Sequence, residues 1–282
     1  MEVLNTKDEV IRYRKRLQDE GVSLGLVPTM GALHEGHLEL VRKACRQNQE
    51  VIVSIFVNPT QFNDPEDLKK YPKTLEKDLA KLRTISCEIK VFAPGVNEMY
   101  GSEILARTYD FDGMDSLMEG AHRPGHFDGV GTIVESLLQL VQPNRAYFGE
   151  KDYQQLVIIR HLAKKQGIRS EIVPCPIVRE KNGLAMSSRN KLLTKSLQKQ
   201  AGLIYQTLVK AKNLFGTKSA SEVKDFVREA FSEYPDFELE YVEIADAYSL
   251  EPVMRKENDK KYRVFVAAYL GGVRLIDNIA LN

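Results

Sequence analysis

The chain has 282 residues, with 40 basic and 39 acidic side chains and a formal net charge of +1. This length predicts one large domain or two modest ones, with ample material for a core. The balanced charge argues against an extended nucleic-acid surface and leaves a small charged substrate open. A charged N-terminal segment and the lack of a long apolar stretch argue against a signal peptide and a membrane span. We expect a soluble, cytoplasmic protein.

Three cysteines, Cys45, Cys87 and Cys175, are odd in number and lie far apart in the sequence. They form no C-x-x-C pair, so we expect reduced, mostly buried thiols in a reducing compartment.

The first part of the chain alternates strand-like and helical runs. Thr6 and Glu9 predict a capping box for a helix that ends near Gly21. Strands are expected at residues 22–27, 51–57, 88–92, 146–148 and 171–178, and further helices from 36 onward and at 74–85, 130–141 and 153–166. This order predicts an α/β fold, a doubly wound parallel sheet with helices on both faces.

The pattern changes after residue 185. Helical segments are expected at 195–214 and 220–234, followed by longer alternating strands at 238–246 and 262–270. This order predicts a smaller α+β domain. We therefore expect two domains, 1–178 and 179–282, with residues 179–183 as the hinge between them.

The most informative motif is the tetrapeptide His34-Glu35-Gly36-His37, which follows the strand at 22–27. It lies where a helix begins, so free N–H groups and the positive end of the helix dipole would face a ligand beside the two imidazoles. This arrangement favours a polyphosphate site. The alternative is a strand–turn–helix corner with two solvated histidines.

Other polar clusters also follow predicted strands, where a doubly wound sheet places its ligands. The first runs from Asn58 to Phe62, and its amides suit a small hydroxy acid; the alternative is a turn containing proline. The second runs from Gly149 to Gln155, where Lys151 suits phosphate and Asp152 a ribose hydroxyl. Its alternative is a charged helix start capped by Asp152.

A third cluster, Ala185-Met186-Ser187-Ser188-Arg189-Asn190, lies just beyond the expected hinge. Two hydroxyls and a guanidinium could neutralise a leaving pyrophosphate, although the segment could equally cap the next helix. His122 and His126 are four residues apart, but a metal pair would need a helix across Pro124-Gly125, which is unfavourable. We interpret residues 123–129 as a substrate-rim loop or a simple turn.

Taken together, these segments resemble the pantoate–β-alanine ligase family, over nearly all of residues 22–190. Five blocks occur in the family's order and spacing: Pro-Thr-Met-Gly-Ala-Leu-His-x-Gly-His, Phe-Val-Asn-Pro-x-Gln-Phe, Arg-Pro-Gly-His-Phe-x-Gly-Val, Gly-x-Lys-Asp-x-Gln-Gln and Met-Ser-Ser-Arg-Asn. The resemblance implies a Rossmann-like N-terminal domain of the HIGH-type nucleotidylyltransferase superfamily and a small C-terminal lid domain. It also implies a homodimer formed by the N-terminal domains.

The implied reaction condenses (R)-pantoate with β-alanine through a pantoyl adenylate, giving pantothenate, AMP and pyrophosphate. By resemblance, the residues that bind ATP are Met30, Gly31, Ala32, Leu33, His34, Glu35, Gly36, His37, Gly149, Glu150, Lys151, Asp152, Val178, Met186, Ser187, Ser188 and Arg189. Those implied in catalysis are His34, His37, Lys151, Ser187, Ser188 and Arg189, with His37 as the proton donor. Asn58, Gln61 and Gln155 would hold pantoate, with Gln61 also beside β-alanine.

The resemblance also implies a requirement for Mg²⁺ with ATP, and adjacent acids after a Tyr-Pro-x-Thr segment are associated with that ion in the family. Here Lys77 stands where an acid is common, and Asp78 remains as the candidate ligand.

Two rival functions stay open. A nucleotidylyltransferase such as phosphopantetheine adenylyltransferase would leave the nucleotide on its product, and a nucleotide-sensing or tRNA-binding relative would catalyse neither step. The Gln61 and Gln155 pair argues against the first, and the near-zero net charge argues against the second.

Overall fold

The computed structural model describes residues 1–63 and 65–282, and they divide into two compact units. The first unit comprises residues 1–150 and 155–176, and the second comprises 151–154 and 177–282. Each unit has its own sheet and its own hydrophobic core.

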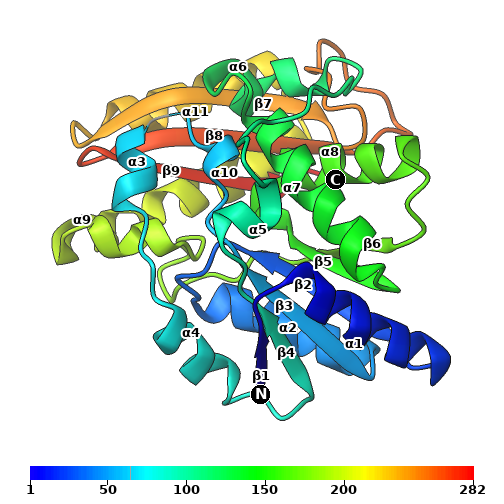
Figure 1. Ribbon diagram of the computed structural model, residues 1–282. Coiled ribbons are helices and arrows are strands. Elements are labelled where there is room, and N and C mark those ends of the chain that lie inside the picture. The colour runs from blue at the N-terminus through cyan, green and yellow to red at the C-terminus, as the bar shows by residue number, and fades with distance from the viewer. Residues whose placement is uncertain (64) are drawn as a thin grey trace. The chain divides into compact units, whose positions relative to one another are not determined.

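A six-stranded parallel sheet forms the centre of the first unit (Figure 1). In spatial order its strands are β1 (Glu2–Leu4), β4 (Ile89–Phe92), β3 (Glu50–Ile55), β2 (Leu24–Thr29), β5 (Arg145–Gly149) and β6 (Glu171–Cys175). From β2 the chain proceeds through β3 and β4 toward one edge, and it later proceeds through β5 and β6 toward the other. The order therefore reverses between β2 and β5, and doubly wound sheets bind ligands at the carboxyl ends of strands at such a point.

Helices cover both faces of this sheet (Figure 1). The helices of this part of the chain are α1 (Lys7–Asp19), α2 (Glu35–Gln47), α3 (Pro65–Lys70), α4 (Leu75–Leu82), α5 (Val96–Tyr100), α6 (Met118–His122), α7 (His126–Val141) and α8 (Tyr153–Lys165). On one face, apolar side chains of α2 and α4 pack on Val27, Val51 and Val91. On the other, α1 packs beside α7. The predicted doubly wound α/β fold is confirmed, as is the capping box of Thr6 and Glu9.

The second unit contains a three-stranded antiparallel sheet of β7 (Phe237–Asp246), β8 (Tyr262–Leu270) and β9 (Val273–Ala280). Helices α9 (Lys195–Gln200), α10 (Gly202–Phe215) and α11 (Ala220–Ser232) complete the unit, and α10 and α11 contribute to its core. The α+β prediction holds, but β9 was not predicted. Gly271 and Gly272 form the two-residue turn before it, both with positive φ, a conformation that glycine adopts readily.

Several element boundaries differ from the sequence prediction. Helix α7 begins at His126 rather than at residue 130, and it is buried on nearly all sides. The expected turn at 123–129 is therefore largely helical, with His122 ending α6 and His126 starting α7. Strand β6 ends at Cys175, and the long helix expected at 195–214 is interrupted at Ala201.

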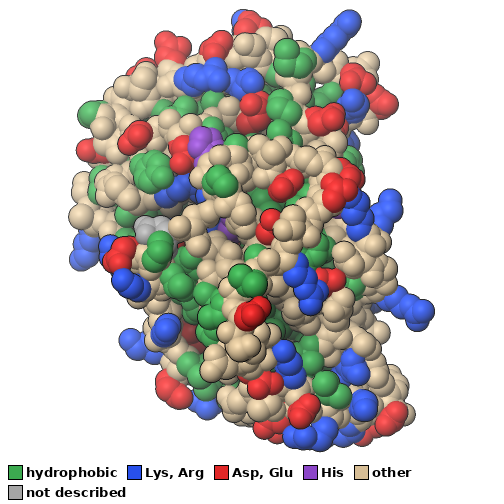
Figure 2. Space-filling model, turned by 45° about the horizontal axis from the view of Figure 1, so that its top comes forward, with side chains coloured by type: hydrophobic (Ala, Val, Ile, Leu, Met, Phe, Trp, Pro, Cys, Tyr) green, Lys and Arg blue, Asp and Glu red, His purple; other side chains and the backbone are tan. Residues whose placement is uncertain are grey.

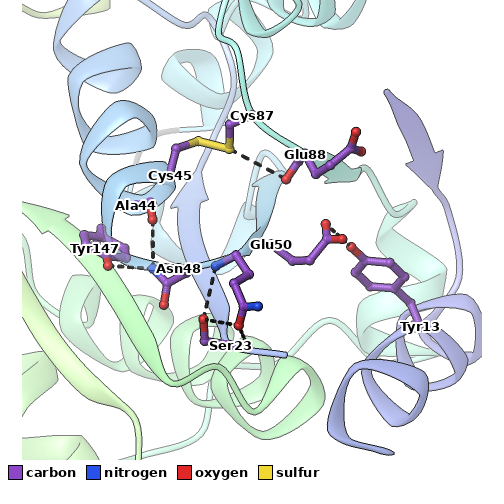
Figure 3. The surroundings of a disulfide bond; sticks show 10 residues. Tyr13, Ser23, Ala44, Cys45, Asn48, Glu50, Cys87, Glu88 and Tyr147 are labelled. Carbon is purple, nitrogen blue, oxygen red and sulfur yellow. Dashed lines mark hydrogen bonds between the residues drawn. A yellow bond between two sulfur atoms is a disulfide. The ribbon is translucent and has the colours of Figure 1, made fainter. Parts of the chain in front are cut away.

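The cysteine prediction was wrong for two of the three residues. Cys45 on α2 and Cys87, just before β4, form a disulfide across a sequence separation of 42 (Figure 3). The packing of α2 beside the loop before β4 brings the Cα atoms to 6.0 Å, which spacing along the chain cannot reveal. Cys175 is a buried free thiol, as expected, and burial raises its pKa to about 11.

Basic and acidic side chains are interspersed on the face shown in Figure 2, in keeping with the balanced composition. Within residues 1–63 and 65–282, no helix is both long enough and apolar enough to span a membrane.

Candidate active site

The predicted strand–turn–helix corner lies at the carboxyl end of β2. The strand ends at Thr29, and α2 begins at Glu35 with His34 as its N-cap. The imidazole rings of His34 and His37 lie side by side, with centroids 4.0 Å apart, and the His34 N–H donates to His37 Nδ1 at 3.3 Å. The corner therefore presents two neighbouring imidazoles at the positive end of a helix dipole, an arrangement that suits phosphate.

The backbone amides of the turn just before the helix donate to protein groups. The Gly31 N–H donates to Thr29 Oγ1 at 3.1 Å. The N–H groups of Ala32 and Leu33 donate to the two carboxylate oxygens of Asp78, at 2.9 and 2.8 Å. The amides that remain in place for an anion are those of the first helical turn, at Glu35 and Gly36.

A second cluster of predicted site residues lies after β3, in the short 3-10 helix η1 (Pro59–Gln61). The Gln61 side chain donates to Met30 Sδ at 2.9 Å and accepts from Asn58 Nδ2 at 3.1 Å. Asn58 is 1% exposed, and its Oδ1 accepts from Tyr100 and from Thr60. Gln61 and Met30 thus meet, and the buried Asn58 holds the Gln61 amide in place.

His126 at the start of α7 also supports Gln61. The His126 ring is buried, and its Nδ1 lies 2.9 Å from the Gln61 carbonyl oxygen. The other ring nitrogen of His126, Nε2, lies 3.1 Å from Arg123 Nη1. Close contact continues at Gly129, where a Cβ would lie 2.2 Å from the Thr60 carbonyl oxygen. Helix α7 therefore fixes the backbone of η1.

The segment from Gly149 to Gln155 divides between the units. Gly149 ends β5, which neighbours β2 in the first unit, and Glu150 follows it. Gln155 lies half-buried on α8 in the same unit. Lys151 and Asp152 belong by their contacts to the second unit, where Asn278 Nδ2 donates to the Lys151 carbonyl at 2.9 Å. Arg263 also stacks on the Tyr153 ring, with the guanidinium carbon 3.9 Å from its centroid.

The remaining predicted residues lie in the second unit, on a hairpin-like segment. An isolated bridge pairs Arg179 with Ala185, and the Met186 N–H donates to the Val178 carbonyl at 2.9 Å, so Val178 and Met186 are neighbours. Ser187 caps a 3-10 helix, η4 (Ser188–Leu192), by accepting from the Arg189 N–H at 3.2 Å. The expected capping role of this segment is therefore present.

Asp78, the candidate magnesium ligand, does not fit a metal ion. It is completely buried, and both of its oxygens accept backbone N–H groups. The neighbouring Lys77 is exposed, and Lys81, one helical turn on, donates to the Leu33 carbonyl. Among residues 1–63 and 65–282, no three His, Cys, Asp or Glu side chains lie together as a metal would require. No sequence pattern indicated these roles of Lys81 and Asp78, because they depend on which helix packs beside the turn.

Comparison with known proteins places this geometry in a family. The family model described as pantoate-beta-alanine ligase matches residues 2–280. Pantothenate synthetases of Christiangramia forsetii and Flavobacterium psychrophilum are 52% and 50% identical over 282 residues, covering 100% of both chains in each case.

Solved structures agree. A pantothenate synthetase from Thermus thermophilus has a TM-score of 0.91 at 41% identity, covering 100% of this chain and 99% of that chain. A pantoate-beta-alanine ligase from Francisella tularensis, solved with beta-gamma ATP and beta-alanine, has a TM-score of 0.81 at 36% identity, covering 100% and 98%. The chain therefore belongs to the pantoate–beta-alanine ligase family.

Proposed function

We propose that this ligase, which joins pantoate to β-alanine with ATP as its family does, works through a pantoyl adenylate. In the first step a pantoate carboxylate oxygen attacks the α-phosphorus of ATP, and pyrophosphate leaves with the electron pair of the broken P–O bond. In the second step the β-alanine amine attacks the acyl carbon, and AMP leaves. Adenylation supplies the leaving group that a free carboxylate lacks, so the protein's task is positioning and charge neutralisation.

The observation that carries this proposal is the pair of imidazoles at the start of α2, next to the switch point of the sheet. We assign His34 and His37 to the phosphates, with His37 as the proton donor. Residues 30–37, Gly149 and Glu150 would surround the nucleotide. Gln61 and Gln155 would hold pantoate, and the Met30 contact of Gln61 supports a pocket beside the nucleotide turn. The buried amide of Asn58 suits positioning Gln61 better than touching the substrate.

In the second unit we assign Lys151, Asp152, Val178 and Met186 to ATP, and Ser187, Ser188 and Arg189 to its phosphates and the departing pyrophosphate. The backbone contact between Val178 and Met186 supports treating them as one segment. Because Asp78 does not fit a cation, we propose that Mg²⁺ enters on the substrate, as MgATP. We also propose a cytoplasmic homodimer formed by the first unit, with the second unit as a lid; these units replace the domain bounds 1–178 and 179–282 expected from the sequence.

The test measures exchange of labelled pyrophosphate into ATP with MgATP and pantoate but no β-alanine. An adenylate-forming ligase shows pantoate-dependent exchange, and added β-alanine then releases AMP and forms an amide. Exchange without amine-dependent AMP release would indicate a nucleotidylyltransferase instead. If neither reaction occurs, the adenylate mechanism is wrong.

A further inference from the structure

The turn between β2 and α2 adopts an unusual backbone conformation. Gly31 and Ala32 both have positive φ, at 80° and 50°, and Ala32 is buried. Residues with a Cβ rarely adopt this left-handed region, and it persists in folded proteins where surrounding groups enforce it. The rings of His34 and His37 follow directly, so the conformation of this turn sets where the imidazoles point.

The enforcing groups come from α4, more than forty residues further along the chain. Asp78 receives the N–H groups of Ala32 and Leu33, one on each oxygen, at 2.9 and 2.8 Å. Its Oδ2 also accepts from Thr74 Oγ1 at 3.1 Å. The backbone approaches so closely that a Cβ on Gly31 would lie 3.2 Å from Asp78 Oδ2. The carboxylate therefore fits two adjacent amides that this turn conformation directs toward it.

A second contact from the same helix completes the arrangement. Lys81, one turn after Asp78, donates its ammonium to the Leu33 carbonyl oxygen. The peptide groups on both sides of Leu33 are thus held, one through its N–H and one through its C=O. Charge-assisted hydrogen bonds of this kind are stronger than neutral ones, particularly where water is excluded.

From this geometry we propose that Asp78 is a positioning residue for adenylation and not a magnesium ligand. Thr74 and Lys81 assist it by holding its carboxylate and the Leu33 carbonyl. Asp78 acts through the turn, by holding the backbone that aims His34 and His37. A metal ligand needs lone pairs directed at a site that the ion can reach, whereas the oxygens of Asp78 are fully buried and engaged. The proposal rests on the proposed assignment of the two histidines to ATP.

The two roles predict different kinetics for Asp78→Asn, which keeps the shape but places an NH₂ group against one backbone N–H donor. A positioning role lowers kcat of pyrophosphate exchange by roughly 10- to 100-fold, as expected when a transition-state donor is misplaced. The half-activating Mg²⁺ concentration and the pantoate KM stay as in the wild type. A ligand role instead raises the half-activating Mg²⁺ concentration, and saturating Mg²⁺ restores kcat.

Glu76→Gln is the matched control, because Glu76 is an exposed carboxylate on the same helix. It should leave kcat and the Mg²⁺ response unchanged. Circular dichroism at the assay temperature checks that both variants are folded.

A milder pair tests the same network if Asp78→Asn does not fold. Thr74→Ser keeps the hydroxyl that donates to Asp78 and should retain wild-type kcat, whereas Thr74→Val should lose roughly three- to tenfold. Lys81→Met, which keeps the chain length without the donor, should resemble Thr74→Val. A packing role for Thr74 would give the opposite order, because Thr74→Ser loses a methyl group and Thr74→Val keeps nearly the same shape.

The positioning proposal is overturned if Asp78→Asn exchanges pyrophosphate like the wild type, if its defect is cured by Mg²⁺, or if Thr74→Val and Thr74→Ser have equal kcat. Each of these results leaves wild-type exchange intact. Loss of exchange in the wild type would instead reject the adenylate mechanism, so the two failures can be told apart.

Discussion

The two segments predicted to contact the phosphates of ATP differ in whether distant or neighbouring residues fix their backbone. In the first unit, residues 29–37 are fixed largely from a distance, through Asp78 and Lys81 on α4. In the second unit, residues 185–190 are fixed mostly by near neighbours: the bridge of Ala185 with Arg179 and the Ser187 cap. A turn enforced by buried groups is set before any ligand arrives, whereas a locally bonded segment can change shape at smaller cost. The first therefore suits fixed alignment of phosphates, and the second suits movement during the reaction.

Arg179, the bridge partner of Ala185, is itself held by distant groups, and breaking its ion pair with Asp277 should give the largest effect. Arg179 donates from both terminal guanidinium nitrogens to the Asp277 carboxylate, at 2.6 and 2.9 Å, and Asp277 is 3% exposed. Asp277→Ala leaves a cation without its buried partner, so we expect about 3–5 kcal/mol lower free energy of unfolding for the second unit. Urea denaturation measures this.

The exposed pair of Arg228 and Asp225 provides the control, since Asp225→Ala should cost less than about 1 kcal/mol. Equal losses for the two variants would show that the Arg179 tie is not what anchors the segment.

The disulfide tests how strongly α2 is anchored in the first unit. Reduction of Cys45–Cys87 frees a loop closed across 42 residues, and the chain-entropy model gives up to about 4 kcal/mol of lost stability. Urea denaturation with and without a phosphine reductant measures the change, and Cys45→Ser should make stability insensitive to the reductant.

Thiol counting provides an independent check on the pairing. Unreduced, denatured protein should contain a single reactive thiol, Cys175. Because burial raises the pKa of that thiol to about 11, it should react slowly in the native protein at about pH 8. Three reactive thiols before reduction would contradict the disulfide.

The contacts between distant elements, such as the disulfide and the hydrogen bonds of Asp78, also separate what the sequence could predict from what it could not. The hydrophobic periods and polar breaks located most strands and helices, because each reflects local burial. They placed His34 and His37 at a helix start for the same reason. The pairing of Cys45 with Cys87 and the role of Asp78 depend on packing between distant elements, which one sequence does not reveal.

Two features that the sequence prediction missed do have a local signal. Leu270-Gly271-Gly272-Val273 is a recognisable hairpin turn between two strand-like runs, and it precedes β9. The second feature is the start of α7 at His126. The Pro124-Gly125 pair suggested a turn through residue 129, but the turn ends at Gly125, which has a positive φ and is the N-cap of α7. The helix then buries His126.

A kinetic comparison sharpens the contrast between the two segments, beginning with the fixed one. His37→Ala should lower single-turnover formation of pantoyl adenylate by about 100- to 1,000-fold, the usual loss for one transition-state donor. Because His37 neighbours His34 in a rigid turn, we expect the remaining imidazole not to replace it. A loss smaller than about tenfold would reject its assignment as proton donor.

Arg189→Ala tests the locally held segment and should have a smaller effect. We expect kcat of adenylation to fall roughly 10- to 100-fold, since one charge-assisted contact to the leaving pyrophosphate is removed. The pantoate KM should remain unchanged, because Arg189 is assigned to the transition state. If only KM rises, Arg189 belongs to ground-state binding.

A small effect is expected at the N-cap of α11, which contacts neither segment and therefore serves as a reference for stability. Ser219 accepts from the Glu222 N–H at 3.2 Å, and Glu222 accepts in return from the Ser219 N–H at 2.9 Å. Ser219→Ala should cost about 1 kcal/mol, typical of a lost helix cap.

This cap also predicts a pH dependence with a definite sign. Hydrogen bonds from the Ser219 backbone and hydroxyl, and then from Lys218, lower the pKa of Glu222 from 4.5 to about 2. A depressed carboxylate pKa means that the stabilisation is complete above about pH 4.5 and is lost as the pH falls toward 2. Ser219→Ala removes one of these hydrogen bonds, so its deficit relative to the wild type should shrink over that range. A deficit that stays constant from about pH 6 to about pH 2 would mean that the serine stabilises α11 independently of the Glu222 charge.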